Sequence, residues 1–119
     1  MTGGPGYRES PNHEVRVERA NGRWRAAMDG RILAESRDAL VIYETGYPPA
    51  VYFPPDDVRR DELAGSESTS YCPFKGRAAY LSRDGVDIAW LYPDPYDEVE
   101  AIRGRVAFYR DHVDVRSVD

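Results

Sequence analysis

The sequence predicts an all-β domain built from short antiparallel strands. Segments in which apolar and polar residues alternate recur along the chain, and Val15 and Val17 among charged neighbours are the first example. A period of two is typical of a half-buried strand. Asn-Gly and Asp-Gly pairs, which favour tight hairpin turns, separate several of these segments. The helical signals are brief, so we expect no more than one or two short helical turns.

The first strands are predicted to form a meander. Asn21-Gly22 is expected to turn a strand at 15–17 into a second strand at 24–28. Asp29-Gly30 is expected to turn that second strand into a third at 31–35 in the same way. The opening half of the chain, including the strand at 39–44, is therefore predicted to be a meander that pairs each strand with its neighbour in sequence.

Two further strands follow before the middle of the chain. The segment 39–44 (ALVIYE) is apolar on both faces, which indicates a more central strand. Proline pairs on both sides of 50–53 delimit a short strand, because proline lacks the amide donor that a sheet requires. Residues 58–63 are then predicted as a short helix and residues 65–70 (GSESTS) as a loop.

The second half is predicted to add two strand pairs. Asp84-Gly85 is the third hairpin signal, between strands at 76–83 and 86–92. A helical turn at 96–102 leads to a last pair of strands. That pair is expected at 105–110 and 112–117.

The composition predicts a single domain. The chain has 119 residues, of which 41% are hydrophobic and 12% aromatic, enough for one buried core. Residues 1–12 are rich in Gly, Pro and polar residues, so we expect a flexible leader there and a domain over 13–119. No segment has the apolar character of a signal peptide or a membrane span. The single cysteine, Cys72, cannot form an internal disulfide, which favours a cytoplasmic protein.

Charge and motifs exclude several classes of function. The 16 basic and 21 acidic residues give a net charge of −5 and are interleaved, whereas proteins that bind nucleic-acid phosphates need clustered positive charge. No GxGxxG or P-loop motif is present. One cysteine with His13 and His112 provides neither a four-ligand zinc site nor a positioned Ser-His-Asp triad. The acidic residues at 94–100 are interpreted as a solvated turn, so we expect no metal and no cofactor.

The segment SYCPFKGRAAY, residues 70–80, contains the only cysteine and the only lysine, Cys72 and Lys75. A nearby ammonium group can stabilise a thiolate nucleophile. No base or oxyanion donor is identifiable, however, and free cysteines are frequently buried and inert. Glu44 ends the apolar segment 39–44, where a carboxylate beside buried surface needs a partner. We therefore predict a Glu44–Lys75 ion pair, or an anionic ligand group at Lys75.

Aromatic residues on several strands are the second functional signal. They are Tyr43, Tyr52, Tyr80, Trp90, Tyr92, Phe108 and Tyr109. An apolar wall with a few phenolic hydroxyls suits a small-molecule pocket. Core packing is the alternative, and it is favoured for Trp90 and Phe108. The phenols of Tyr52, Tyr80 and Tyr109 need water or a partner, which favours them as pocket residues.

Four segments in this order resemble the bacterial domain family of unknown function numbered four-two-seven. The resemblance runs from about Val15 to about Val115 and is carried by ETGYPPAVYFPPDDV (44–58), STSYCPFKGRAAY (68–80), IAWLYPDP (88–95) and IRGRVAFY (102–109). It implies the β-tent fold, in which antiparallel sheets meet at an angle, as in the thalidomide-binding domain of cereblon and in methionine sulfoxide reductase B.

The sequence departs from those wider relatives in two ways and does not support one label given to its own family. Several of them carry a four-cysteine zinc site, which a chain with Cys72 alone does not inherit. The catalytic cysteine of the reductase has no clear counterpart. The family also carries a nucleotidyltransferase-like label, but Gly65-Ser66 is not followed by the Asp-x-Asp pair that two-metal phosphoryl chemistry needs.

The hypothesis from sequence is a small-ligand-binding module for an unknown small molecule. The cereblon-like relatives hold ligands in an aromatic cage, so the resemblance implies a pocket around Trp90 and the tyrosines. The candidate residues are Glu44, Tyr52, Cys72, Lys75, Tyr80, Trp90 and Tyr109. Two alternatives are a metal-independent enzyme that uses Cys72 or Lys75, and a domain that recognises a peptide or protein through an exposed strand edge. No nucleic-acid or membrane partner is expected, and the oligomeric state is undetermined.

Overall fold

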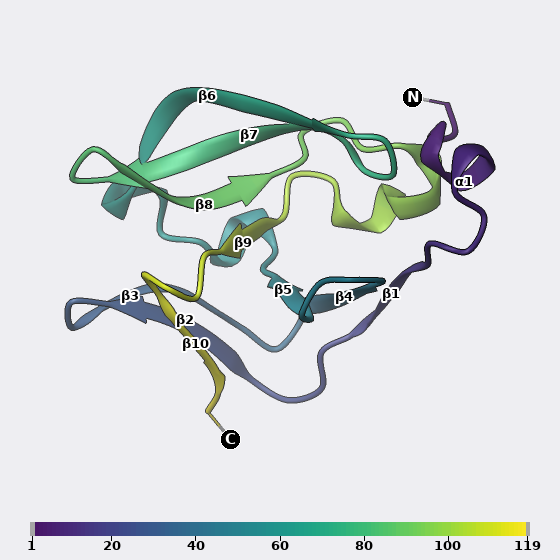
Figure 1. The fold of residues 1–119 in the computed structure, drawn as a ribbon. Coiled ribbons are helices and arrows are strands. Elements are labelled where there is room, and N and C mark those ends of the chain that lie inside the picture. The colour runs from purple at the N-terminus through teal and green to yellow at the C-terminus, as the bar shows by residue number, and fades with distance from the viewer. Residues whose placement is uncertain (1, 119) are drawn as a thin grey trace.

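Residues 2–118 are described by a computed structural model in which short strands form three antiparallel sheets (Figure 1). A four-stranded sheet lies across the top of the view, and two three-stranded sheets lie below it. The helical segments are short, so the predicted all-β fold class is confirmed. Met1 and Asp119, the outer limits of the predicted leader and domain, lie outside the described residues.

The first sheet has the order β1-β4-β5, formed by Val15–Arg19, Leu40–Glu44 and Ala50–Tyr52. β4 is central, as its apolar character on both faces predicts. The meander prediction is wrong for β1, which pairs with β4 and not with the next strand. It is also wrong for the strand that precedes β4 in sequence, which lies in another sheet. Its ladder is extended by a hydrogen bond from the Ala20 N–H to the Ala39 carbonyl. The turn-like Asn21-Gly22 segment therefore connects two sheets.

The second sheet has the order β10-β2-β3, formed by Asp114–Ser117, Trp24–Met28 and Arg31–Ser36. The β2–β3 hairpin is confirmed: Asp29 and Gly30 have φ values of 52° and 74°, as a tight turn of this kind requires. β10 pairs with β2, so the last strand of the chain joins a sheet formed by two early strands.

The third sheet has the order β6-β7-β8-β9, formed by Ala64–Cys72, Gly76–Arg83, Val86–Leu91 and Val106–Phe108. The Asp84-Gly85 hairpin joins β7 to β8 as predicted. The last predicted strand pair is wrong, because β9 lies in this sheet and β10 in the second one.

Residues 65–70 are part of β6, so their prediction as a loop is wrong. β6 is the edge strand of its sheet, and most of its side chains are exposed. A strand that buries little apolar surface has no alternating pattern to reveal it. The shift in pairing register between Gly65 and Thr69 weakens the pattern further.

Among residues 2–118, helical structure is limited to one α-helical turn, α1 (Gly6–Glu9), and three 3₁₀ segments. The 3₁₀ segments are η1 (Pro55–Asp57), η2 (Arg60–Glu62) and η3 (Asp97–Ile102). The helix predicted at 58–63 is reduced to the single turn η2. Val58 does not join it, because this residue is buried and forms a β-bridge to Ala34. The turn predicted at 96–102 is present as η3. Within residues 2–118, no helix is long and apolar enough to span a membrane.

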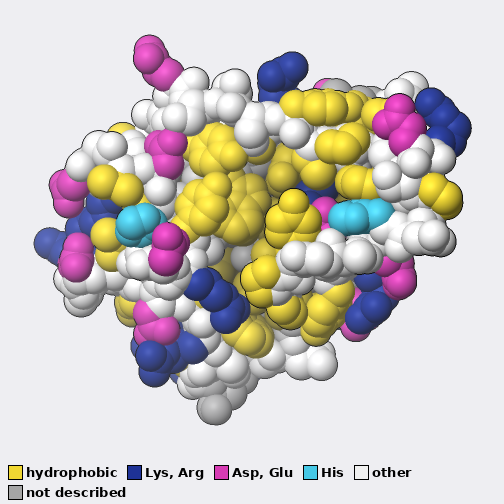
Figure 2. All heavy atoms as spheres, viewed as in Figure 1, with side chains coloured by type: hydrophobic (Ala, Val, Ile, Leu, Met, Phe, Trp, Pro, Cys, Tyr) yellow, Lys and Arg dark blue, Asp and Glu magenta, His cyan; other side chains and the backbone are white. Residues whose placement is uncertain are grey.

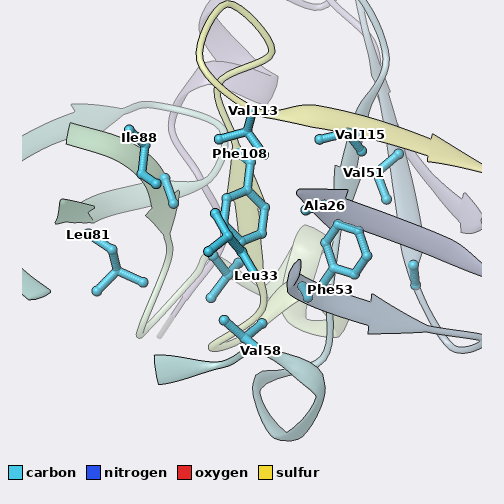
Figure 3. Packing of buried hydrophobic residues seen from close by; sticks show 14 of the residues in the cluster. Ala26, Leu33, Val51, Phe53, Val58, Leu81, Ile88, Phe108, Val113 and Val115 are labelled. Carbon is cyan, nitrogen blue, oxygen red and sulfur yellow. The ribbon is translucent and has the colours of Figure 1, made fainter. Parts of the chain in front are cut away.

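The main core lies between the sheets and draws side chains from all three (Figure 3). The fully buried Phe53 packs edge-on against Phe108, with ring centroids 5.8 Å apart. Reciprocal backbone hydrogen bonds between Phe53 and Val106 connect the β5 end to β9. A second cluster of buried residues contains Ile42, Tyr52, Ala78, Tyr92, Val99, Ile102 and Ala107. Three members of this second cluster, Ile42, Tyr52 and Tyr92, also line a cavity.

The N-terminal arm (residues 2–14) includes the segment predicted as a flexible leader, and it packs on the β6–β7 turn. The Gly6 N–H donates to the Pro73 carbonyl and the Tyr7 hydroxyl donates to the Phe74 carbonyl, each at 3.0 Å. A Cβ atom on Gly4 would lie 2.7 Å from the Pro73 carbonyl oxygen, and one on Gly6 would lie 2.8 Å from the Phe74 ring. Glycine, a residue typical of flexible segments, here permits close packing.

Candidate functional site

A cavity of about 420 Å³ lies between the first and third sheets. Its walls come from β4, β5 and their connection, from the end of β6 and the turn after it, and from β7 and β8. The end of β9, the two residues after it and Val115 of β10 complete the lining. In Figure 2, hydrophobic side chains gather in the hollowed middle of the visible face. Both the size and the apolar lining are typical of small-molecule sites, whose volumes run from about 300 to 1,000 Å³.

All seven candidate residues line this cavity. They are Glu44, Tyr52, Cys72, Lys75, Tyr80, Trp90 and Tyr109. They belong to segments that are far apart in the sequence, and β-sheet pairing brings them together. The structure thus places the predicted residues at one site, while their role in ligand binding stays a prediction.

The predicted Glu44–Lys75 ion pair is present at one end of the cavity. Lys75 Nζ donates to Glu44 Oε1, and both side chains are less than a tenth exposed. His13 Nε2 lies 2.9 Å from Glu44 Oε2, so each carboxylate oxygen has its own partner. Lys75 Nζ also lies 6.0 Å from the centre of the Tyr92 ring, at the outer limit of a cation–π contact. We call Glu44, Lys75 and His13 the polar end.

His13 is the residue of the polar end that sequence analysis missed. Its ring stacks on Phe74 at 4.1 Å with 21° between the planes, and Tyr7 packs edge-on against the same ring at 5.1 Å. The N-terminal arm therefore fixes His13 beside Glu44. A single histidine after a Gly- and Pro-rich segment belongs to no motif, so only the docking of the arm reveals its position.

Aromatic side chains form the opposite part of the cavity. Trp90 Nε1 donates to the Tyr52 hydroxyl at 3.0 Å, and the Trp90 and Tyr109 rings lie 4.6 Å apart. The Tyr80 and Tyr109 rings are nearly parallel, and the Tyr80 hydroxyl is hydrogen-bonded to Ser70 Oγ at 2.7 Å. We call Tyr52, Tyr80, Trp90 and Tyr109 the aromatic end.

Burial raises the pKa values of Tyr52, Tyr92 and Tyr109, so these cavity phenols stay protonated well above neutral pH. It raises the pKa of Tyr109 to about 12, with a further contribution from the hydrogen bond with Tyr80. It also raises the pKa values of Tyr52 and Tyr92 above the usual value for tyrosine. These hydroxyls are therefore hydrogen-bond donors at physiological pH.

The prediction that Phe108 and Trp90 pack in the core fits Phe108 better than Trp90. Phe108 is buried in the main core and also lines the cavity. Trp90 is half-buried and packs at the edge of the second cluster, where its ring forms part of the cavity wall. Tyr92, Tyr47 and Arg110 also line the cavity, although sequence analysis did not include them among the candidate site residues.

Cys72 ends β6 and is half-buried in the cavity wall. Across residues 2–118, the side-chain contacts of the Lys75 ammonium group are with Glu44 and Tyr92, and none is with the Cys72 thiol. The ammonium group is therefore paired with a carboxylate. This arrangement differs from the thiolate–cation pair that an activated cysteine requires.

The acidic residues at 94–100 make ion pairs and hydrogen bonds. Arg103 binds Asp94 at 3.0 Å and Glu100 at 2.7 Å, and Glu98 accepts from the Gly4 N–H at 2.9 Å. In the part of the chain that the structure describes, no group of three or more His, Cys, Asp or Glu side chains could hold a metal ion.

A family model described as a domain of unknown function, DUF427, matches residues 16–119. No curated protein matches the chain. The match includes every cavity-lining residue, but it begins after His13.

Proposed function

The chain belongs to the DUF427 family of domains of unknown function, and we propose that it is a small-molecule-binding module. The proposed ligand occupies the cavity between the first and third sheets. One observation carries this proposal: separated segments converge on a cavity of about 420 Å³ that has an ion pair at one end and aromatic rings at the other. We further propose that the protein acts in the cytoplasm, because its single thiol suits a reducing compartment.

The aromatic end suits a flat apolar group. Trp90 and Tyr109 are half-buried and line the cavity, so a bound ring would remove their remaining apolar surface from water. Burial of that surface favours binding, and ring-on-ring packing adds about 0.5–1.5 kcal/mol beyond it. The Trp90–Tyr52 hydrogen bond fixes the indole, which lowers the entropy cost of ordering it on binding.

The polar end suits a hydrogen-bond acceptor on the ligand. Both oxygens of Glu44 already have partners, whereas Lys75 has three N–H donors and one acceptor among the described residues. The Tyr52 hydroxyl accepts from Trp90 and keeps its own proton available for donation. We therefore propose a planar organic molecule that carries a carbonyl or a related oxygen acceptor.

Two alternatives remain proposals with weaker support. An enzyme that uses Cys72 or Lys75 needs an activated group, and the Lys75 ammonium group is paired with Glu44. An interaction domain would use the exposed edge of β6, where strand addition is chemically possible. A concave cavity lined by aromatic residues favours a small ligand over either alternative.

A ligand screen with matched variants tests the proposal. We expect aromatic metabolites with an oxygen acceptor to raise the melting temperature in a saturable way. Trp90→Leu is expected to remove this shift, because it removes one wall of the cavity. Tyr43→Leu is the control, since Tyr43 lies on β4 but outside the cavity and contacts Arg16. A shift that survives Trp90→Leu unchanged would place the ligand elsewhere and contradict the proposal.

A further inference from the structure

We infer that the ligand is an amphipathic anion, namely a planar organic carboxylate or phosphate whose charged group binds Arg110. This inference rests on the proposed function, since it assigns a chemical class to the ligand of the same cavity. The ring of the proposed ligand packs on Trp90 and Tyr109, and its oxygen acceptor faces Lys75. Three observations carry it: the charge of the lining, the saturation of Glu44 and the position of Arg110.

The lining has a positive charge balance in an acidic protein. Its Lys, Arg, Asp and Glu side chains are Lys75, Arg110 and Glu44, a surplus of one positive charge. The whole chain has a net charge of −5. A cavity with low-dielectric walls concentrates the field of its own charges, so this surplus favours an anion over a cation.

Glu44 cannot bind a cationic ligand in the observed arrangement, because both of its carboxylate oxygens already have partners. Lys75 occupies Oε1 and His13 occupies Oε2, and both contacts are at least partly buried. An ammonium group entering the cavity would have to displace one of them or remain unpaired. An unpaired buried charge is strongly unfavourable. The available donors, on Lys75 and the phenols, favour an oxygen-rich ligand.

Arg110 is an exposed cation at the mouth of the cavity, and no ion pair forms on it within residues 2–118. A guanidinium group donates two parallel hydrogen bonds to a carboxylate or phosphate, which makes it a selective hydrogen-bond donor for such anions. Asp87 and Asp111 act electrostatically on the neighbouring Tyr109, but neither lines the cavity. Arg110 is therefore available to a ligand that extends from the cavity.

The two cations approach the cavity from opposite ends of β8. The Tyr109 N–H donates to the Ile88 carbonyl near the start of β8, and Arg110 follows directly. The Lys75 carbonyl accepts from the Tyr96 N–H, beyond the end of β8. The aromatic wall formed by Trp90 and Tyr92 lies between them. A ligand with an anionic group at one end and a neutral acceptor at the other matches this spacing.

Three probes with the same ring test the charge preference: indole-3-acetate, indole-3-acetamide and tryptamine. Their side chains are anionic, neutral and cationic at pH 7. We expect calorimetric titration of the full chain at low salt to give at least about tenfold tighter binding of the acetate than of the acetamide. Tryptamine is expected to bind most weakly. A parallel comparison of 1-naphthoate with 1-naphthyl phosphate distinguishes a carboxylate ligand from a phosphate ligand.

Arg110→Gln is expected to weaken acetate binding about tenfold and to leave acetamide binding unchanged, because it removes the charge and keeps a polar side chain. Arg60→Gln is the matched control, since Arg60 is exposed in η2 and outside the cavity. It is expected to change neither affinity.

The outcomes separate this inference from the proposed function. Equal or tighter binding of the acetamide or tryptamine to the wild-type chain overturns the anion inference and leaves a ligand-binding cavity in place. If Arg110→Gln still binds indole-3-acetate more tightly than indole-3-acetamide by the wild-type factor, the carboxylate does not bind Arg110. That result also overturns the inference. If neither the indole nor the naphthalene probes bind, the inference fails. The proposed function fails with it only if the wider screen gives no ligand that depends on Trp90.

Discussion

The main core around Phe53 and the polar end around Glu44 are both buried, but different forces maintain them. Phe53 is held by apolar contacts from three sheets and a ring contact with Phe108. Glu44 is held by two polar partners, Lys75 and His13, from the β6–β7 turn and the N-terminal arm. A core loses stability in proportion to the volume removed. A buried ion pair depends on both partners being present, and it is weak evidence for stability.

This difference indicates why the polar end is a better functional candidate than the core. Apolar side chains of similar volume frequently replace a buried ion pair without loss of stability. A fold that buries Lys75 and Glu44 beside a cavity therefore does so at no clear gain in stability. The Glu44–Lys75 pair instead holds the Lys75 N–H donors in a defined position at the cavity wall.

Phe53→Ala is expected to have the largest effect in this comparison. Removing a fully buried ring should lower the free energy of unfolding by about 3–5 kcal/mol, measured by denaturant titration. Val86→Ala is the control, because Val86 is 46% exposed and should change stability by less than about 0.5 kcal/mol. A small loss for Phe53→Ala would mean that the sheets close over the removed volume.

Lys75→Met should lower stability by about 3 kcal/mol or more, because it leaves the buried Glu44 carboxylate without its cation. The double variant Glu44→Gln/Lys75→Met removes both charges and is expected to recover most of that loss. Denaturant titration of the three proteins gives both values. A double variant as unstable as the single one would show that the polar end stabilises the fold in the same way as the core.

His13→Ala should lower stability by about 1.5–3 kcal/mol, the range for a hydrogen bond to a charged group. His13→Gln, which retains a donor, is expected to lose less. Amide hydrogen exchange at Gly6, whose N–H donates to the Pro73 carbonyl, should be faster in His13→Ala than in the wild type. The reason is that the stacking of His13 on Phe74 helps to hold the arm. Unchanged exchange in His13→Ala would mean that the arm docks independently of the polar end.

Alkaline pH is expected to destabilise the fold through its buried phenols. The pKa values of Tyr7 and Tyr109 are raised by burial to about 12 in the folded state, and the unfolded value is about 10. The neutral phenols therefore favour the folded state fully below pH 10, and this contribution is lost as the pH rises from about 10 to 12. Absorbance at 295 nm should show fewer ionised tyrosines at pH 11 in the folded than in the unfolded chain.

Cys72→Ala is expected to have the smallest effect, below about 1.5 kcal/mol, because the side chain is half-buried and lines a cavity. Iodoacetamide should alkylate Cys72 at pH 7 no faster in the folded protein than in the unfolded one. Faster alkylation in the folded protein would indicate an activated thiolate and would favour the enzyme alternative.

Particular elements show where sequence reasoning succeeded. The β2–β3 and β7–β8 hairpins were predictable because Asp-Gly supplies two residues that tolerate positive φ, a requirement fixed within the turn itself. The Glu44–Lys75 contact was predictable because each charge sits next to apolar sequence and needs a partner. The edge strand β6 was not predictable, because its exposed side chains leave no alternating pattern.

By itself, the sequence determined the all-β class, the Asp-Gly hairpins and the residue types available for a pocket, because these follow from local φ preferences and the period of apolar residues. Tertiary structure alone decided that β1 pairs with β4, that β9 and β10 lie in different sheets, and that His13 reaches Glu44. Each of these depends on which apolar faces and donors meet across long separations in sequence. Local propensity places no constraint on such long-range partners, whereas burial and hydrogen-bond satisfaction do.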